Sequence, residues 1–159
     1  MTKKIIISLI VLLGGTSVKA GQIEATELLS VYVPVHVALS GDDVAAARVH
    51  TATLKGVAEK LQAQLIESDP QGANLVLVVS GSEILASSIT DEEARLAFGT
   101  LAKGIVEFIR NDAALQASWQ LFFCSMTKPY GFWVQPKGVK ITNPYWGSKM
   151  LHCGSKKNW

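Results

Sequence analysis

The stretch VAAARVHTATLKGVAEKLQAQL, residues 44–65, carries the clearest periodic pattern in the chain. Its apolar or small positions recur at steps of three and four residues: Val44, Ala47, Thr51, Leu54, Ala58, Leu61 and Leu65. Residues at this spacing share one side of an α-helix, so the stretch predicts a helix that buries one face. The helix is expected to end before Asp69-Pro70, because proline disfavours helical geometry in the residue before it.

A second helical pattern precedes this stretch, over residues 24–40. Four residues lie on one stripe at alternating four- and three-residue steps: Leu28, Tyr32, Val35 and Leu39. Pro34 predicts a kink or a break in the helix, and valines at every second position leave a strand as the alternative. Gly41 is expected to close the segment, and Asp42-Asp43 to cap the helix that follows.

Two further helices are expected downstream. Residues 73–88 are ambiguous, because residues 75–79 favour a strand by composition while the length favours a helix. The next stretch begins with Thr90-Asp-Glu-Glu93, which matches a capping box, and it ends near Asn111. Its predicted buried stripe is Phe98, Leu101, Ala102, Ile105, Phe108 and Ile109. Four helices with short connections predict a mainly α protein, built as an antiparallel four-helix bundle.

The composition changes from residue 115 onward. All four tryptophans lie there, together with Pro129, Pro136 and Pro144. Such a stretch predicts a short helix over residues 113–123, followed by turns and one small hairpin across residues 131–141. Because aromatic side chains bury large areas, we expect residues 115–159 to pack on the helices as an irregular cap. Residues 21–159 would then form a single domain.

The first twenty residues are typical of a cleaved signal peptide. Lys3 and Lys4 precede an apolar run, and Val18-Lys-Ala20 is typical of a cleavage site. The run is too short to cross a bilayer comfortably, so we expect a soluble protein secreted to the periplasm, with no stable membrane anchor after cleavage. Removing Lys3, Lys4 and Lys19 leaves 12 of the 15 basic residues against 13 acidic ones, a formal charge of −1. This balance excludes the basic surface of a nucleic-acid-binding protein.

The soft donor atoms gather near the C-terminus. Apart from Met1, the sulfur-bearing residues form two clusters, Cys124-Ser-Met126 and Met150-Leu-His-Cys153. Thiolate and thioether ligands select copper(I) and similar soft ions. We therefore predict a copper(I) or silver(I) site made by Cys124, Met126, Met150 and Cys153, with His152 as a candidate fifth ligand. Zinc is disfavoured, because thioethers are not among its usual ligands.

A disulfide is the alternative for the two cysteines. Secreted proteins commonly pair their cysteines. A bridge across the 29 positions from Cys124 to Cys153 would stabilise the fold by roughly 3 to 4 kcal/mol. The protein would then be an interaction module that binds no metal. The two states are compatible, because a reduced pair could bind the ion and an oxidised pair could release it.

The sequence lacks the common catalytic motifs. It has no G-x-S-x-G, no phosphate-binding Gly-rich loop and no H-E-x-x-H, so we expect no enzyme activity. Cys124 and His152, taken as nucleophile and base, lack a third orienting group, and a thiol redox enzyme would require a reactive thiolate. His36 and His50 are expected to be structural or surface residues.

The segment Asn143-Pro144-Tyr145-Trp146-Gly147 is typical of a sharp turn. Asparagine before proline begins such turns, and glycine permits the abrupt exit. We expect this turn to direct residues 148–153 back toward Cys124. Trp133 and Trp146 are expected to shield the metal site from water.

Together these motifs resemble a periplasmic family catalogued as a domain of unknown function. The family occurs alone after a leader, or fused to CusB-like membrane-fusion subunits of heavy-metal efflux pumps. The resemblance rests on Cys124-Ser-Met126, Gly131-Phe-Trp133, Ile141-Thr-Asn-Pro-Tyr-Trp-Gly147 and Met150-Leu-His-Cys-Gly154, and on helical signatures at 32–39 and 95–98. Ser125 replaces the family's usual proline. The resemblance implies a helical bundle with a metal-handling cap, and an efflux membrane-fusion protein or another periplasmic copper protein as partner.

Overall fold

The computed structural model describes residues 20–159, and their side chains from residue 25 onward. The predicted signal peptide lies outside the described residues except for Ala20, where the first helix begins. None of the helices in residues 20–159 combines the length and the apolar character that crossing a membrane requires.

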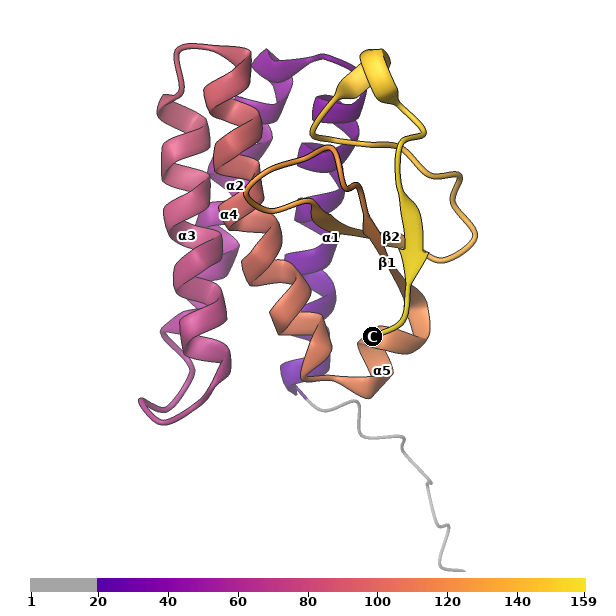
Figure 1. The fold of residues 1–159 in the computed structure, drawn as a ribbon. Coiled ribbons are helices and arrows are strands. Elements are labelled where there is room, and N and C mark those ends of the chain that lie inside the picture. Colours follow the sequence, from indigo (N-terminus) through magenta and orange to yellow (C-terminus); the bar gives the residue numbers. More distant parts are fainter. Residues whose placement is uncertain (1–19) are drawn as a thin grey trace, which may run out of the picture.

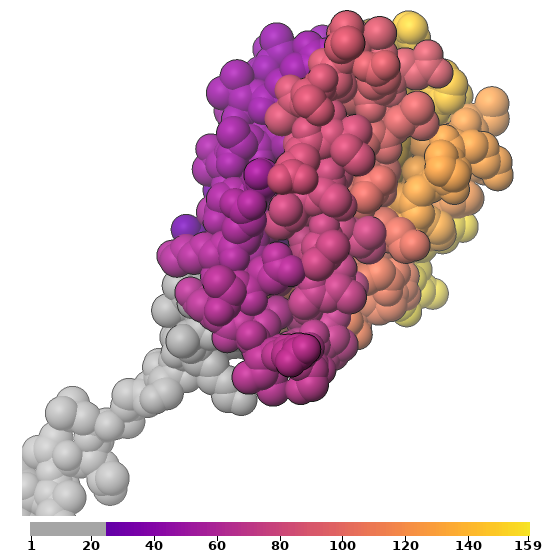
Figure 2. All heavy atoms as spheres, turned by 90° about the vertical axis from the view of Figure 1, so that its left-hand side faces the viewer, coloured from indigo at the N-terminus to yellow at the C-terminus, as the bar shows by residue number. Residues whose placement is uncertain are grey.

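Four long helices make up most of the molecule: α1 (Ala20–Ser40), α2 (Val44–Gln62), α3 (Gln71–Ser87) and α4 (Asp91–Arg110). Helices that follow one another in the chain are in contact, and Figure 1 shows the four side by side. In Figure 2, α2 and α3 cover the face turned toward the viewer, and the C-terminal segment lies at its far edge. The prediction of a mainly helical fold is confirmed.

Two of these helices decide between the alternatives that the sequence leaves open. α1 is helical through Pro34, so residues 24–40 form neither a strand nor two helices. α3 is helical through its β-prone centre, and it buries Leu75, Val78 and Leu85 on one side. β propensity spans only about 1 kcal/mol and depends on context, so burial of this face outweighs it.

The buried stripe of α2 is the predicted one, and the helix ends before Asp69-Pro70 as expected, at Gln62, so that Leu65 lies beyond it. Six of the predicted positions are buried: Val44, Ala47, Thr51, Leu54, Ala58 and Leu61. Thr51 is tolerated there because its hydroxyl donates a hydrogen bond of 2.6 Å to the carbonyl of Ala47. At the other end, the Asp43 carboxylate accepts a hydrogen bond of 2.9 Å from the Ala46 N–H. Asp43 therefore caps α2 as predicted.

The N-terminus of α4 has the predicted capping box. Thr90 Oγ1 accepts a hydrogen bond of 3.1 Å from the Glu93 N–H. The Glu93 carboxylate accepts bonds of 2.8 Å and 3.1 Å from the N–H groups of Ile89 and Thr90. These bonds lower the pKa of Glu93. The six residues of the predicted stripe, from Phe98 to Ile109, are all buried.

The C-terminal cap contains a small antiparallel sheet. Its elements are α5 (Ala113–Ser118), β1 (Trp119–Phe123), β2 (Phe132–Pro136), the 3-10 turn η1 (Gly147–Met150) and β3 (Ser155–Lys157). The strand order is β2-β1-β3, with β1 in the centre. Phe122 lies opposite Trp133 on one side and opposite Lys156 on the other.

This sheet corrects two predictions. The helix expected over residues 113–123 stops at Ser118, and the aromatic stretch that follows it becomes a strand. The hairpin expected across residues 131–141 is wrong, because β2 pairs with β1. Aromatic residues favour strands, but the partner of a strand cannot be read from its local pattern when a long loop separates the two.

Aromatic side chains hold the cap on the helices. Phe98 of α4 stacks on Tyr32 of α1, with ring centres 6.1 Å apart, and meets Tyr145 of the cap edge-on at 5.3 Å. Tyr145 in turn meets Trp133 at 6.1 Å, and Trp133 stacks on Phe122 at 5.6 Å. Such pairs add about 0.5–1.5 kcal/mol each beyond the area they bury. The prediction of an aromatic-rich C-terminal segment packed on the helices is confirmed.

The turn between α1 and α2 is hydrogen-bonded both to the cap and to α4. Asp42, and not Gly41, has the left-handed conformation, with φ of 62°. Its carboxylate accepts a hydrogen bond of 2.7 Å from the Arg95 guanidinium and another of 3.0 Å from the Ser148 N–H. Arg95 also donates to the carbonyl of Pro144. Hydrogen bonds from Ser148, with the Arg95 charge, hold the pKa of Asp42 below its usual value, so Asp42 links the turn to the cap.

The buried His36 is expected to make stability depend on pH. Its Nε2 donates a hydrogen bond of 3.0 Å to the carbonyl of Thr142, and burial lowers its pKa to about 4. Between the folded-state pKa and the unfolded-state pKa of about 6.5, His36 is protonated in the unfolded chain but not in the folded chain. Stability therefore falls as pH falls, by about 2 kcal/mol between about pH 7 and about pH 5.

Urea denaturation at a series of pH values measures this slope. His36→Gln keeps a donor for Thr142 but has no titrating ring, so we expect its slope between about pH 7 and about pH 5 to be smaller by that amount. An equal slope in the two proteins would contradict the role of His36.

Candidate functional site

The two cysteines meet in the cap. Cys124 directly follows β1 and Cys153 lies between η1 and β3. Cys124 is buried, with 1% of its surface exposed, and Cys153 is partly exposed. Both are free thiols, and the Cys153 thiol hydrogen-bonds to the Cys124 sulfur. Folding therefore brings together two sulfur atoms that lie far apart in the sequence.

The backbone around each cysteine is held by short turns. The Cys124 N–H donates to the carbonyl of Gly131 at 3.0 Å, and the Thr127 N–H donates to the carbonyl of Cys124 at 3.3 Å. Gly131 is required at its position, because a Cβ there would collide with the Cys124 carbonyl oxygen. On the other side, the Cys153 N–H donates to the carbonyl of Met150 at 2.9 Å. Both sulfur atoms therefore start from fixed backbone positions.

The surroundings of the pair favour a negative charge on Cys124. Burial alone would raise the pKa of Cys124, but four hydrogen-bond donors act against it. They are the Cys153 thiol, the Met126 N–H, the Thr127 hydroxyl and the Asn143 amide, and the net pKa is lowered. The pKa of Cys153 is raised to about 11, first because its proton is held in the bond to Cys124 and then because of burial. Of the two cysteines, Cys124 is therefore the one whose surroundings favour the thiolate, and thiolates are the form that binds metal.

Asn143 connects the two halves of the site. It is fully buried, and its amide nitrogen donates to the Cys153 carbonyl at 2.7 Å as well as to the Cys124 sulfur. Its Oδ1 accepts bonds of 2.8 Å and 3.2 Å from the N–H groups of Tyr145 and Trp146. Without the asparagine these groups would lose their partner, and the Tyr145 N–H among them is buried, so Asn143 holds both the turn and the cysteines in place.

The rest of the predicted turn fixes the path toward Cys153. The Gly147 N–H donates to the Asn143 carbonyl at 3.0 Å, and Gly147 has φ of 54°. A Cβ at Gly147 would also collide with the Asp42 carboxylate. The Pro144 carbonyl accepts a hydrogen bond from the Arg95 guanidinium. The Tyr145 hydroxyl donates a hydrogen bond of 2.6 Å to the Phe132 carbonyl. The turn is thereby joined to α4, to β2 and to the α1–α2 turn.

Neither predicted shielding residue is fully exposed. Trp133 is fully buried, and its ring fills the space beside Gly154, where a Cβ would collide with it. Trp146 is partly buried, and its indole N–H donates to Thr127 Oγ1 at 3.0 Å. Trp133 therefore covers the backbone next to Cys153, and Trp146 reaches Cys124 through Thr127.

The other predicted ligands differ in exposure. Met126 is 59% exposed and Met150 is partly buried in η1. No hydrogen bond in the described part of the chain involves either thioether. His152 is exposed, and its Nδ1 donates a hydrogen bond of 2.8 Å to the Ile141 carbonyl. The other ring nitrogen, Nε2, is not used in this bond. Within residues 25–159, no group of three or more His, Cys, Asp or Glu side chains is placed to hold a metal ion.

Thr127 was not among the site residues that the sequence predicted. Its hydroxyl hydrogen-bonds to the Cys124 sulfur and accepts the indole N–H of Trp146. A hydroxyl three residues after a cysteine is the signal that could have found it, because a turn brings residues at this spacing together. In the sequence, Arg95 belongs only to a helical signature, because its bonds to Asp42 and Pro144 depend on the tertiary structure.

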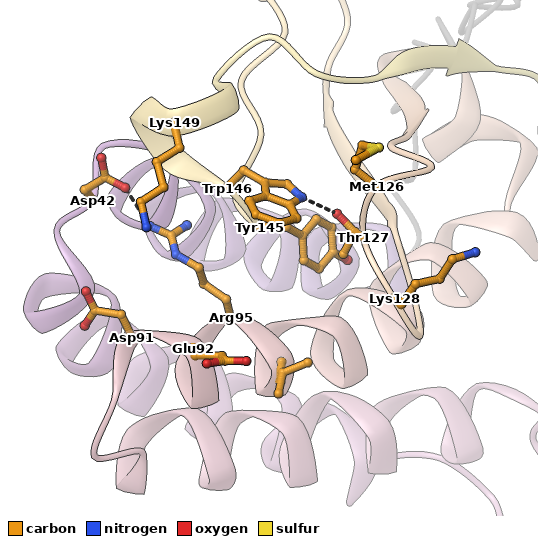
Figure 3. Close-up of a pocket in the computed structure, with 11 residues that line it drawn as sticks. Asp42, Asp91, Glu92, Arg95, Met126, Thr127, Lys128, Tyr145, Trp146 and Lys149 are labelled. Atoms are coloured by element: carbon orange, nitrogen blue, oxygen red, sulfur yellow. Dashed lines mark hydrogen bonds and ion pairs between the residues drawn. The ribbon is translucent and has the colours of Figure 1, made fainter.

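Two neighbouring hollows lie between α4 and the cap. The larger has a volume of about 650 Å³, and Figure 3 shows the residues that line it. The smaller has a volume of about 330 Å³. The two hollows share five lining residues: Arg95, Leu96, Thr127, Lys128 and Tyr145. We call these two hollows together the α4 furrow. Thr127 lines both hollows and also contacts the Cys124 sulfur, so one side chain separates the furrow from the cysteine pair.

Comparisons with protein-family models, with curated proteins and with solved structures found no match for this chain. The resemblance to the periplasmic family therefore stays a prediction from the residues. What can be argued about function comes from the cysteine pair, the turn that holds it and the α4 furrow.

Proposed function

We propose that this protein binds copper(I) or silver(I) in the periplasm, through Cys124 and Cys153, and either sequesters the ion or passes it to an efflux or delivery partner. The observation that carries the proposal is the contact between the two thiols, with hydrogen bonds that favour a thiolate at Cys124. Soft sulfur ligands select copper(I) over harder ions. A site of few donors, as two neighbouring thiols provide, suits this ion.

The positions of the remaining donors support a small ligand set. Met126 and Met150 belong to the same two turns as the cysteines, and His152 directly precedes Cys153. In this proposal each adds a neutral donor beside the two sulfur atoms. Trp133 and Trp146 would limit the access of water and oxidants to the bound ion.

The helices would serve as the scaffold of this site. In this proposal the four long helices are an antiparallel bundle, and the cap presents the metal on one side of it. The resemblance described above suggests that the partner is a membrane-fusion subunit of a heavy-metal efflux pump or another periplasmic copper protein. The protein would then be a binding protein and not an enzyme.

Titration of the reduced protein with copper(I) against a competing chelator tests the proposal. We expect stoichiometric binding of one ion, and Cys124→Ser and Cys153→Ser should each weaken the affinity at least about tenfold. Even a residue that only orients a ligand costs about 10- to 100-fold when it is lost. Met126→Leu and Met150→Leu conserve side-chain volume, so they are expected to preserve the fold. They should also weaken copper(I) binding less than the cysteine variants do.

Two results would decide against this function. If the wild-type protein holds copper(I) no better than the variant lacking both thiols, the metal site does not exist. If the protein recovered from cells carries a Cys124–Cys153 disulfide that a glutathione buffer fails to reduce, the second candidate is favoured. That candidate is a disulfide-stabilised interaction module, and the contact between the two thiols supports it as well.

A further inference from the structure

The α4 furrow carries charges of both signs on its two sides. Asp91 and Glu92 line it from the first turn of α4, while Lys128 and Lys149 line it from the cap. None of these four side chains forms an ion pair with another described residue, whereas Arg95 at one end is paired with Asp42. Figure 3 shows the acidic pair on α4 and the two lysines on the segments that face it. The furrow therefore presents two carboxylates that could bind an ammonium group and two lysines that could bind carboxylates.

The lining between these charges is apolar, and the volume suits a small ligand. Leu96 is 51% exposed, and it lines the furrow together with Tyr145 and Trp146. Small-molecule sites are typically clefts of about 300–1,000 Å³ with an apolar lining and a few polar groups that orient the ligand. The larger hollow, of about 650 Å³, lies within that range.

The furrow also borders the sulfur site. Met126, an exposed residue, lines the larger hollow. Thr127 and Trp146 line it as well, and the Trp146 indole N–H donates a hydrogen bond of 3.0 Å to the Thr127 hydroxyl. The Thr127 hydroxyl is also in contact with the Cys124 sulfur. A ligand that brought a sulfur atom into the furrow would therefore hold it beside Met126 and one side chain away from Cys124.

We propose that the α4 furrow binds a short peptide thiol with free ammonium and carboxylate groups, and that such a peptide delivers copper(I) to the cysteine pair. The ammonium group faces Asp91 and Glu92, and the carboxylates face Lys128 and Lys149. The delivery step rests on the proposed function, but the binding of the metal-free peptide does not.

The delivery is a ligand exchange in which no atom changes its oxidation state. Copper(I) arrives bound to two peptide thiolates. The Cys124 thiolate forms a copper–sulfur bond as one peptide thiolate leaves. Cys153 then forms the second bond, the second peptide thiolate leaves, and the proton of Cys153 passes to it. The products are the copper(I)-bound cysteine pair, one free peptide thiolate and one free peptide thiol.

Reduced glutathione is the probe for the first half of the proposal. Isothermal titration of the full-length reduced protein, free of metal, should show saturable binding. Glu92→Gln and Lys128→Gln should each weaken this binding by about fivefold, as expected for one solvent-accessible charge contact. Glu67→Gln and Lys137→Gln are the matched controls, because both residues are exposed and neither lines the furrow. Absence of saturable binding, or equal losses in the controls, would overturn the furrow assignment.

The rate of copper(I) transfer from its glutathione complex tests the second half. Transfer should be about fivefold slower to Glu92→Gln and Lys128→Gln than to the wild type and to the two controls. Equal rates in all five proteins would overturn delivery through the furrow. A wild-type protein that takes copper(I) from a chelator but binds no glutathione would overturn the furrow alone. One that binds glutathione but no copper(I) would overturn the proposed function and leave the peptide site supported.

Discussion

Replacing Asn143 by alanine is expected to lower the free energy of unfolding by about 4 kcal/mol. The side chain is fully buried and satisfies the N–H groups of Tyr145 and Trp146 and the carbonyl of Cys153. Alanine has no polar atom to offer them, and a buried polar group without a partner costs about 1–3 kcal/mol. The same change removes a donor from the Cys124 sulfur, so the pKa of Cys124 should rise. Equilibrium denaturation and the pH dependence of thiolate absorbance measure the two effects.

Asn143→Asp separates these effects. Aspartate keeps the oxygen that accepts from Tyr145 and Trp146, but it has no amide to donate to Cys124. We expect it to retain more stability than the alanine variant and still to raise the pKa of Cys124. Asn158→Ala, at an exposed position, should change stability by no more than about 0.5 kcal/mol. The role assigned to Asn143 is wrong if its alanine variant is as stable as the Asn158 variant.

Adding one methyl group between α3 and α4 should destabilise the protein by about 3 kcal/mol. A Cβ at Gly81 would collide with the backbone nitrogen of Leu101, and a Cβ at Gly104 would collide with the Asn74 carbonyl. Because the obstacles are backbone atoms, the helices must move apart to accept either alanine. Overpacking of this kind costs typically 1–3 kcal/mol and sometimes more. Gly81→Ala and Gly104→Ala are therefore expected to lower the midpoint of urea denaturation strongly.

Gly56→Ala is the matched control, because a Cβ at Gly56 of α2 has nothing within 4 Å. Alanine is favoured over glycine within a helix by about 1 kcal/mol, so this variant should be more stable than the wild type. The opposite signs at Gly56 and at Gly81 distinguish packing from helix propensity. If Gly81→Ala also stabilised the protein, the close approach of α3 and α4 would be refuted.

The α3–α4 contact also matters for the site. α4 carries Arg95, which holds the Asn143–Gly147 turn through Pro144, and it carries Glu92 and Leu96 on the wall of the furrow. A shift of α4 would therefore move the wall of the furrow and the anchor of the turn together. We expect the glycine variants to weaken copper(I) binding as well, in proportion to their loss of stability.

The helices were largely predictable because their signals are local. The stripe of α2 and the capping box at Thr90 and Glu93 depend on residues only three or four positions apart, and both appear in the structure as predicted. Pro34 does not split α1, because a single missing hydrogen bond is outweighed when Leu28, Tyr32 and their neighbours are buried. α3 was ambiguous because residues 75–79 favour a strand by composition, while burial of Leu75, Val78 and Leu85 favours the helix.

The cap was less predictable because its contacts join distant segments. Nothing in the sequence of β1 indicates that Phe122 will lie opposite Trp133 and Lys156. The role of Asp42 was also missed. As a residue before a helix it was expected to cap α2, yet in the structure it binds Arg95 and the Ser148 N–H.

For the candidate site, the sequence by itself determined the chemistry on offer: two thiols, two thioethers and a histidine in two short clusters, and a turn at Asn143 between them. Only the tertiary structure decided which of these groups meet. It brought Cys153 against Cys124, added Thr127 and Asn143 as hydrogen-bond donors, and left Met126 exposed beside the furrow. The physical reason is that residue type sets which bonds an atom can form, whereas its neighbours and its access to water depend on how the cap packs against α1 and α4.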